Sequence, residues 1–583
     1  MKFPAMKRHA TPLWVLCVLC GLALPCAALD REAFSITNYD LRLTVDTGQH
    51  RLGVRGKITL RNDTSAPQKN AVLQISSSLD WRAITAGDKA VQFLTQPFTS
   101  DIDHTGSLSE AIVTLPQPVA PNATAELEIG YEGVILPDAT RLTRLGTPES
   151  SARSSDWDQI SPSFTGLRGA GNVAWYPIAT EAASLSEGDM FDVLGRWKAR
   201  EVGSKMHLRV AMIGNYEVPP QILFSAASCA VSAFESTSMP NQQINAECNY
   251  QSLGLDVPAF VIADYGVLKK PAIEVRYLQG DEIAAASYAG SAEKIVPLVA
   301  DWLGDPRQKA MTADLPDPNA SPFESGALLL TPLAGTDAKV AGLTAAHQLA
   351  HAALQSPRPW INEGLAHFMQ ALYLEHQKGR QTALDYMGLH RSAFSELEKT
   401  ASSLHGQEAT QRALANTTNE ELYRSKAMYV WWMLRDMVGD AALKKALKNY
   451  RPEDDHAPEY MPGLITAQSQ RDLQWFFDDW VYHDRGLPDF KIDSVFPSRT
   501  TSNSYLVTIT VVNSGTAGAE VPVFVRTTGP DDITKRVEVR AGGKATFRVE
   551  LASAPREVVV NDGSVPESDM TNNVFSLETP AKP

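Results

Sequence analysis

Apolar and polar residues alternate over much of the first half of the chain. Segments in which every second side chain is apolar are typical of strands with one buried face. Examples are "YDLRLTV", "VRGKITLR" and "AELEIGYEG". We therefore predict a large antiparallel β-domain over residues 29–278. Within it, residues 144–164 are rich in Ser, Pro and Gly, which predicts a long surface loop.

The period of the pattern changes at residue 281, where apolar residues begin to recur at spacings of three and four. This spacing is typical of amphipathic helices. We predict a mostly helical domain over residues 279–490 that contains one strand-like stretch, "SGALLLTPL". Its later helices are expected at 338–354, 361–378, 381–399, 420–438, 440–449 and 471–483.

Alternation returns from about residue 492 and continues to the end of the chain. Short alternating strands separated by turn residues are typical of a sandwich, and Gly542-Gly543 is expected to form a hairpin turn. We predict a small immunoglobulin-like β-sandwich over residues 491–583. The predicted fold is therefore multidomain α+β, in the order β, α-rich, β.

The first 28 residues have the organisation of a secretory signal peptide. Three basic residues precede an apolar run at 13–24, and small residues precede the expected cut after Ala28. The alternative is an uncleaved membrane anchor, although the run is shorter than the roughly 18 to 20 residues that a spanning helix needs. We expect an exported protein, periplasmic or extracellular, with no membrane span after cleavage.

Composition and charge limit the classes of partner. With 44% hydrophobic and 21% charged residues, the chain has the composition of a globular protein. Signal cleavage removes three of the 53 basic residues and leaves 50 against 67 acidic ones, a net charge of −17. So acidic a chain is not expected to bind nucleic acid.

Two of the five cysteines, Cys229 and Cys248, remain in the mature chain. In an exported protein such a pair favours one disulfide, which closes a loop of about 20 residues and stabilises by roughly 3 kcal/mol. The alternative is two buried free thiols.

The stretch "AAHQLAHAALQSPRPWINEGLAHF", residues 345–368, holds the candidate chemistry. His347 and His351 lie four residues apart, so a helix presents both imidazoles on one face, within reach of one metal ion. The prolines at 357 and 359 end this helix and allow a second one to return beside it with Glu363. Two histidines and one carboxylate are the ligand set of catalytic zinc, with a fourth position open.

His-x-x-x-His followed by Trp-Ile-Asn-Glu-Gly-Leu-Ala resembles the gluzincin zinc metallopeptidases of the aminopeptidase N type. The segments "SKAMYVWWMLRDMVGD" and "DLQWFFDDWVYHDRGLPDF" are similar to downstream parts of that family's catalytic domain. The resemblance implies a thermolysin-like domain between the family's N-terminal β-domain and its β-sandwich; the family's large C-terminal helical domain has no counterpart here. Eleven residues separate His351 from Glu363 where the family usually has eighteen, as in its more compact branch.

The resemblance implies that His347, His351 and Glu363 bind one zinc ion per chain. It also places Gln348 where the family has its general base, a glutamate. A glutamine amide can hydrogen-bond to a water but has no basicity to accept its proton. His367 lies one turn after Glu363 and is a candidate for a neighbouring position in the site or for a fourth ligand.

Two further positions depart from the family pattern. The Gly-x-Met-Glu-Asn strand is absent, and Glu324 in "FESGALLLTP" stands in its place, as a contact to substrate or as a replacement base. Tyr423 is the candidate for oxyanion support, although counted back from Lys426 it is one residue out of register, with Tyr429 as the fallback. Asp337 or Thr336 is expected to cap the first zinc helix.

Three functional hypotheses follow. The first is a zinc-binding peptidase homologue that binds a peptide or protein and hydrolyses it weakly or not at all. The second is an active zinc metallopeptidase that uses another base, such as Glu324. The third is a metal-free scaffold whose function lies in its β-domains.

Overall fold

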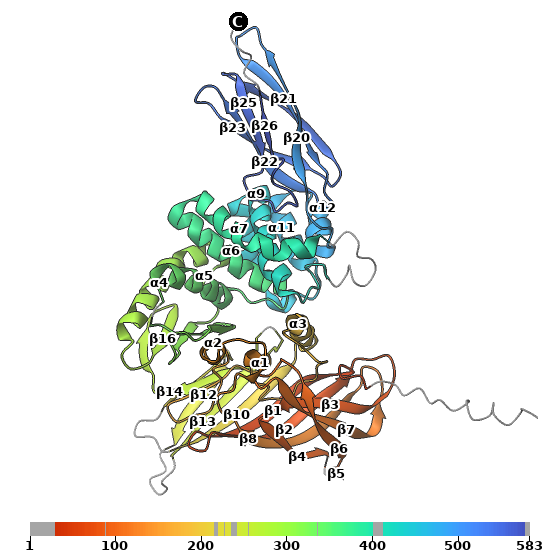
Figure 1. Ribbon diagram of the computed structural model, residues 1–583, viewed down its shortest axis with the longest axis vertical. Helices are drawn as coiled ribbons and strands as arrows, with labels where there is room; N and C mark the ends of the chain where they lie inside the picture. Colours follow the sequence, from red (N-terminus) through yellow and green to blue (C-terminus); the bar gives the residue numbers. More distant parts are fainter. Residues whose placement is uncertain are drawn as a thin grey trace, which may run out of the picture.

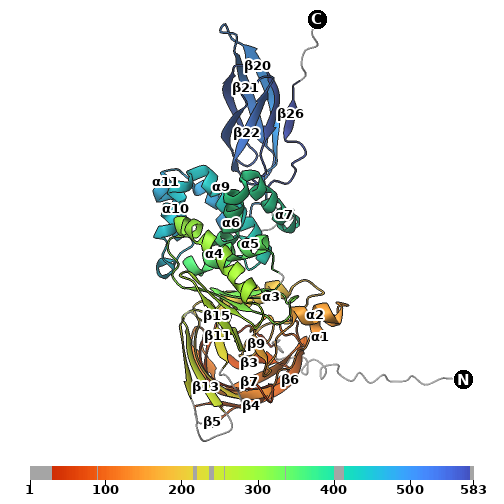
Figure 2. The same ribbon diagram turned by 90° about the vertical axis from the view of Figure 1, so that its left-hand side faces the viewer.

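The computed structural model describes residues 29–577, except 88, 215–219, 227, 235–241, 255, 335 and 400–411. The predicted signal peptide lies outside the described residues. Three parts follow one another along the long axis of the molecule: a strand-rich N-terminal part, a helical part and a C-terminal pair of sheets (Figures 1 and 2). The prediction of a multidomain chain that mixes α and β structure is confirmed. No helix within the described ranges is long and apolar enough to cross a membrane.

The N-terminal part is built on one eight-stranded sheet. In spatial order its strands are β12 (Ser228–Phe234), β13 (Gln242–Tyr250), β10 (Lys205–Gly214), β1 (Phe34–Asp46), β2 (Arg51–Asn62), β8 (Thr124–Val134), β4 (Leu79–Ala86) and β5 (Lys89–Ala90). The alternating residues behave as predicted, since Leu41, Leu43 and Val45 are buried between exposed neighbours. One pair departs from the predicted antiparallel order, because β1 and β10 run parallel. A parallel pair needs a long crossover, and more than 150 residues separate these two strands.

Two small sheets and three helices complete this part. The sheets are β3 (Gln68–Ser76), β7 (Ser107–Val119) and β6 (Gln92–Thr99), and β11 (Gln221–Phe224), β14 (Phe260–Ala263) and β9 (Phe164–Leu167); the helices are α1 (Thr140–Thr143), α2 (Glu149–Ser155) and α3 (Met190–Arg200). Helix α3 lies between the large sheet and the helical part (Figure 1).

The prediction of a long surface loop at 144–164 is wrong. The segment contains α2, and its carboxylates Asp156 and Asp158 are buried. Arg141 donates to Asp156 at 2.9 Å and Arg168 donates to Asp158 at 2.8 Å. Turn-rich composition could not reveal this, because both arginines lie outside the segment.

The disulfide prediction is confirmed. Cys229 and Cys248 face each other across β12 and β13 and are joined by a disulfide bond. The bond therefore fixes the edge strand β12 to its neighbour.

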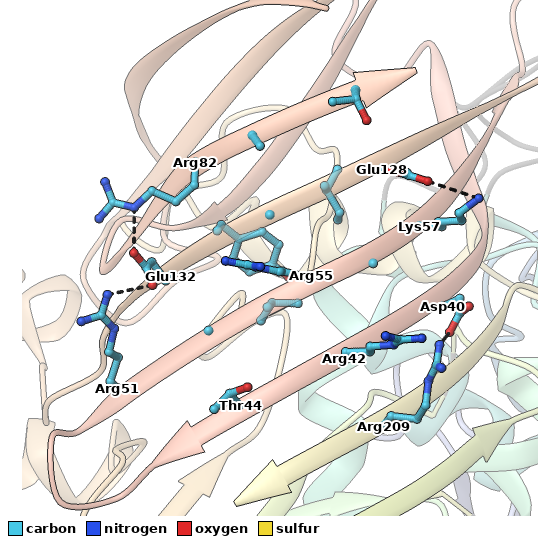
Figure 3. Close-up of a pocket in the computed structure, with 18 of the residues that line it drawn as sticks. Asp40, Arg42, Thr44, Arg51, Arg55, Lys57, Arg82, Glu128, Glu132 and Arg209 are labelled. Carbon is cyan, nitrogen blue, oxygen red and sulfur yellow. Dashed lines mark hydrogen bonds and ion pairs between the residues drawn. The ribbon is translucent and has the colours of Figure 1, made fainter. Parts of the chain in front are cut away.

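One face of the large sheet is hollowed into a concavity of about 1020 Å³ (Figure 3). Many of its charged side chains are paired: Arg51 and Arg82 contact Glu132, at 2.7 and 3.2 Å, and Lys57 contacts Glu128 at 3.3 Å. No residue that lines it belongs to the histidine-bearing segment 345–368. We therefore place the candidate chemistry at the histidines and not in this hollow.

The helical part packs on a five-stranded sheet, in the order β15 (Gly266–Lys269), β16 (Ile273–Tyr277), β17 (Ala310–Asp314), β19 (Leu328–Thr331) and β18 (Phe323–Ser325). Strands β15 and β16 precede residue 278, so this sheet crosses the predicted boundary between the first two domains. Local alternation identified them as strands, but it does not say which sheet a strand joins.

The helices are α4 (Glu282–Leu303), α5 (Ala338–Ala353), α6 (Pro359–Lys378), α7 (Arg380–Glu398), the π-helix η2 (Leu422–Lys426), α9 (Ala427–Val438), α10 (Asp440–Asn449), the short η3 (Pro452–Asp454), α11 (Tyr460–Ser469), α12 (Gln474–Phe477) and the π-helix η4 (Asp478–Tyr482). Sequence reasoning missed α11, which contains Pro462-Gly463. Pro462 is tolerated because it lies in the first turn, where its missing N–H has no partner within the helix.

The C-terminal part consists of two facing sheets. One contains β20 (Phe490–Arg499), β21 (Tyr505–Asn513) and β24 (Lys544–Leu551), and the other contains β23 (Ile533–Val539), β22 (Ala519–Thr527), β25 (Pro555–Val560) and β26 (Val574–Ser576). The prediction of a hairpin at Gly542-Gly543 is wrong, because β23 and β24 belong to different sheets. The glycines reverse the chain, but they do not determine its hydrogen-bond partner.

A buried ion cluster ties the helical part together. The Lys426 ammonium donates to Glu398 and to Asp484, both at 2.9 Å, and the three side chains are 1–2% exposed. Burial alone would lower the pKa of Lys426, but the two carboxylates raise it above its usual value. The cluster joins the end of α7, the end of η2 and the segment that follows η4.

Replacement of Lys426 by methionine leaves the buried Glu398 without its cation, while Asp484 keeps only Arg412, whose Nε lies 2.9 Å from Asp484 Oδ2. We expect Lys426→Met to lower the free energy of unfolding of the helical part by roughly 3–5 kcal/mol, measured by urea denaturation followed by circular dichroism. The control is Lys444→Met, since Lys444 pairs with Asp301 at 2.6 Å where the two side chains are 24% and 57% exposed. The control should cost less than about 1 kcal/mol. Equal losses in the two variants would contradict the prediction.

Candidate metal centre

Helices α5 and α6 form a helical hairpin that carries the predicted ligands. Asp337 caps α5 by accepting hydrogen bonds from the backbone N–H groups of Lys339 and Val340, as predicted. Pro357 lies in the break that follows, and Pro359 is the first residue of α6, where a missing N–H costs nothing. The break is five residues long, so the two helices pack against each other.

The Trp-Ile-Asn-Glu-Gly string sets the position of α6 against α9. Trp360 stacks on Trp431 with ring centroids 5.0 Å apart, and the Trp431 indole N–H donates to the Trp360 carbonyl oxygen at 3.1 Å. A Cβ on Gly364 would lie 2.6 Å from the Cβ of Ala427 in α9. The close approach therefore requires glycine, and it holds the preceding residue, Glu363, in place.

His347, His351 and Glu363 converge. Glu363 Oε2 lies 3.7 Å from His347 Nε2, and Glu363 Oε1 lies 3.6 Å from His351 Nε2. The two imidazole rings have centroids 4.8 Å apart. One carboxylate from α6 thus faces both histidines of α5.

These separations fit a metal better than hydrogen bonds. A hydrogen bond between nitrogen and oxygen spans about 2.7–3.2 Å. Ligand atoms bound to one tetrahedral zinc at about 2.0–2.1 Å lie about 3.4 Å from each other. The observed 3.6 and 3.7 Å are close to the second value. Two imidazoles and one carboxylate therefore form a donor set that fits zinc.

Glu324 supports the first histidine. Its Oε2 lies 2.8 Å from His347 Nδ1, which turns the Nε2 of the same ring toward Glu363. A carboxylate that holds the outer nitrogen of a ligating histidine is the usual second layer of a zinc site. Burial would lower the pKa of His347, but Glu324 outweighs it and the pKa lies above its usual value.

Arg424 also contacts Glu363, with its Nε 3.2 Å from Oε2, the oxygen that faces His347. Burial would raise the pKa of Glu363, but Arg424 and the nearby histidines lower it well below the usual range. Glu363 is therefore ionised at neutral pH, as a metal ligand must be. Arg424 also pairs with Glu420 in the same segment.

His367 extends the cluster by one helical turn. Its ring centroid is 5.0 Å from that of His347, and one candidate ligand atom from each of His347, Glu363 and His367 lies within 4.8 Å of the others. Glu324, His347 and His351 form a second such group. Burial and the neighbouring His347 lower the pKa of His367 well below its usual value, so its ring is neutral.

Gln348 points into the core and not toward the cluster of ligands. Its amide nitrogen donates to the carbonyl oxygens of Met311 at 2.8 Å and Ala327 at 3.1 Å. Its amide oxygen accepts from the hydroxyls of Tyr288 and Thr312, both at 3.1 Å. The side chain is fully buried. An amide offers two donors and accepts two hydrogen bonds, so this one has no capacity left for a metal-bound water.

Tyr423, the candidate for oxyanion support, lies half-buried in η2 next to Arg424. Burial raises its pKa well above the usual value, with further contributions from Glu420 and Glu363. The segment that carries Tyr423, Leu422–Lys426, is a π-helix, which winds one extra residue into its turn. Tyr429, the fallback, is buried in α9 against Phe394.

Sequence reasoning missed the residues that the N-terminal part and η2 bring to the site. Besides Arg424, Asp256 interacts electrostatically with His351 and Glu363, and Lys198 of α3 interacts with Glu363. Burial raises the pKa of Asp256 and lowers that of Lys198. About 90 to 155 residues separate Asp256 and Lys198 from His347 and His351, so no local pattern could have found them.

No protein-family model matches the chain, and neither does any curated protein. Among solved structures, aminopeptidase A from Legionella pneumophila in complex with aspartic acid is similar, with a TM-score of 0.60 and 12% identity, over 92% of this chain and 59% of that one. A mutant M1 zinc metallopeptidase from Deinococcus radiodurans, bound to a Tyr-Ser-Ala substrate, gives a TM-score of 0.46 and 16% identity, over 79% of this chain and 97% of that one. The aminopeptidase match shows that the chain has a peptidase fold.

Because its amide faces two carbonyl oxygens, Gln348 cannot be exchanged for glutamate without loss. We expect Gln348→Glu to lower the free energy of unfolding by about 1–3 kcal/mol for each carbonyl that loses its donor, measured by urea denaturation at pH 7. Burial should raise the pKa of the new carboxyl, so the loss should grow as pH rises from about 4 to 7.

The matched control is Gln370→Glu. Gln370 is only half-buried, and its amide nitrogen donates to one carbonyl oxygen, that of Leu343, at 3.2 Å. A Gln348→Glu variant as stable as this control would show that the four hydrogen bonds do not hold the helix.

Proposed function

We propose that this protein is an exported zinc-binding homologue of metallopeptidases that binds peptides and whose hydrolytic activity is weakened or lost. The peptidase fold supports the first half of this proposal. The observation that carries it is the placement of Glu363, with its two oxygens 3.6 and 3.7 Å from the imidazole nitrogens of His351 and His347. Export is inferred from residues 1–28.

The residues around the ligands are arranged to bind a cation. Glu363 supplies a charged carboxylate, and Glu324 orients His347 through Nδ1. The side chains of His347 and Glu363 keep 13% and 18% of their exposure, and that of His351 keeps 4%. The cluster is thus mostly desolvated, which strengthens ionic contacts, yet open enough for an ion to enter.

The proposed loss of hydrolysis rests on the missing base. Bound zinc would lower the pKa of a coordinated water to about 7. Transfer of the proton then needs a carboxylate, and such general acid–base help is typically worth about 10²–10⁴-fold in rate. Gln348 has no basicity, and its amide is already fully hydrogen-bonded within the core.

A peptide is the proposed ligand because the cluster lies where the N-terminal and helical parts meet. Helix α3 contacts the helical part there, since a Cβ on Gly195 would lie 2.5 Å from the carbonyl oxygen of Thr418. Lys198 from the same helix and Asp256 bring charges of both signs to the site. These charges suit the termini or side chains of a bound peptide.

A second candidate function is active hydrolysis with Glu324 as the base. One observation favours it: Glu324 Oε1 is buried and has no hydrogen-bond partner among the residues that the structure describes. In this alternative the free oxygen accepts the proton that Gln348 cannot. The other oxygen of Glu324, Oε2, lies 2.8 Å from His347 Nδ1, which favours a role for Glu324 in orienting His347 instead.

Metal content tests the proposal first. We expect the purified protein, loaded with zinc and dialysed, to hold one zinc per chain by mass spectrometry of metals. His347→Ala and His351→Ala should each remove it, whereas His376→Ala, a histidine at the end of helix α6, should not. A chain that takes up no zinc would support the metal-free scaffold instead.

Peptide hydrolysis separates the remaining two functions. The zinc-loaded wild type is expected to cleave a broad peptide library no faster than His351→Ala does. Robust cleavage that is lost on Glu324→Gln while zinc is retained would establish the alternative. Gln348→Glu is expected to lose stability and not to gain activity, because the new carboxylate points into the core.

A further inference from the structure

His367 lies beside the three candidate ligands, His347, His351 and Glu363, but is not one of them. It follows Glu363 by four residues on α6, so both side chains lie on one face of the helix. His347 and His351 have the same spacing on α5. The hairpin therefore presents two i, i+4 pairs to one another. His347 lies close to each of the other three residues: its ring centroid is 4.8 Å from that of His351 and 5.0 Å from that of His367, and its Nε2 is 3.7 Å from Glu363 Oε2.

One nitrogen of the His367 ring is not used by another polar group. Its Nδ1 is buried and has no hydrogen-bond partner among the described residues. Its ring lies edge-on to that of His347, with centroids 5.0 Å apart at 77°, and a candidate ligand atom lies within 4.8 Å of those of His347 and Glu363. A buried imidazole nitrogen without a partner is unfavourable, and coordination to a metal through that nitrogen would satisfy it.

We propose that His367 is a fourth protein ligand, so that this protein holds zinc in a closed site of three histidines and one glutamate. The inference rests on the proposed zinc binding and deepens it. Four protein ligands are typical of structural zinc, whereas catalytic sites keep one position open. A closed site agrees with the loss of the base at Gln348, since a centre without room for a water has no use for a proton acceptor.

Glu324 is the competitor for the fourth position, because it forms a group with His347 and His351. Its Oε2 is engaged by His347 Nδ1 at 2.8 Å, which places the carboxylate behind the ring. His390 lies next to His367, with ring centroids 5.5 Å apart, but belongs to neither of the two ligand groups. It therefore offers a matched control.

Cobalt substitution tests the number of protein ligands. The protein is loaded with Co²⁺, its uptake is measured, and its visible spectrum is recorded before and after addition of azide, which binds an open metal position. We expect one Co²⁺ per chain and a wild-type spectrum that azide does not change. His367→Ala should lower the affinity for Co²⁺ by at least about 10-fold and make the spectrum respond to azide. His390→Ala should behave as the wild type.

The outcomes distinguish this inference from the function on which it rests. If the wild type binds one Co²⁺ and azide changes its spectrum, the site is open and only the fourth ligand is refuted. If the wild type binds no metal, the proposed function itself fails. If His367→Ala does not fold, the response of the wild type to azide still decides, and zinc X-ray absorption, which should count three imidazoles and not two, gives a second measure.

Discussion

One buried carboxamide determines how the site-bearing helix sits. Gln348 uses both donors and both acceptor positions of its amide to tie α5 to two strand-region carbonyl oxygens and to hydroxyls on α4 and β17. These four bonds set the rotation of α5 about its axis. His347, the preceding residue, is therefore directed toward α6 and Glu363. The amide of Gln348 therefore anchors the helix that carries the candidate ligands.

Charge balance around Glu363 follows from that orientation. The helix presents two imidazoles to the carboxylate, and Arg424 of η2 also contacts it. All three partners lower the pKa of Glu363 against the effect of burial. Four segments thus each contribute one kind of group. Helix α5 supplies the two imidazole rings, α6 the Glu363 carboxylate, η2 the Arg424 guanidinium, and β18 the Glu324 carboxylate that orients His347.

Much of this could be predicted from the sequence, because it depends on local pattern. The spacing of His347 and His351, the cap at Asp337 and the break before Pro359 all act within a few residues. The direction of Gln348 could not be predicted, since its partners come from strands and a helix about 20 to 60 residues earlier in the chain. Arg424 was not predicted as a site residue for a related reason, because a π-helix changes which side chains of its segment face the site.

The close contact at Gly364 has a consequence for how such chains are recognised. Any side chain there would force α6 away from Ala427 and disturb the stacked Trp360–Trp431 pair. The helix interface itself therefore opposes substitution at these positions, whether or not the chain hydrolyses peptides. A Trp-Ile-Asn-Glu-Gly sequence thus indicates that two helices pack closely at this point, and it does not by itself indicate that the chain is catalytically active.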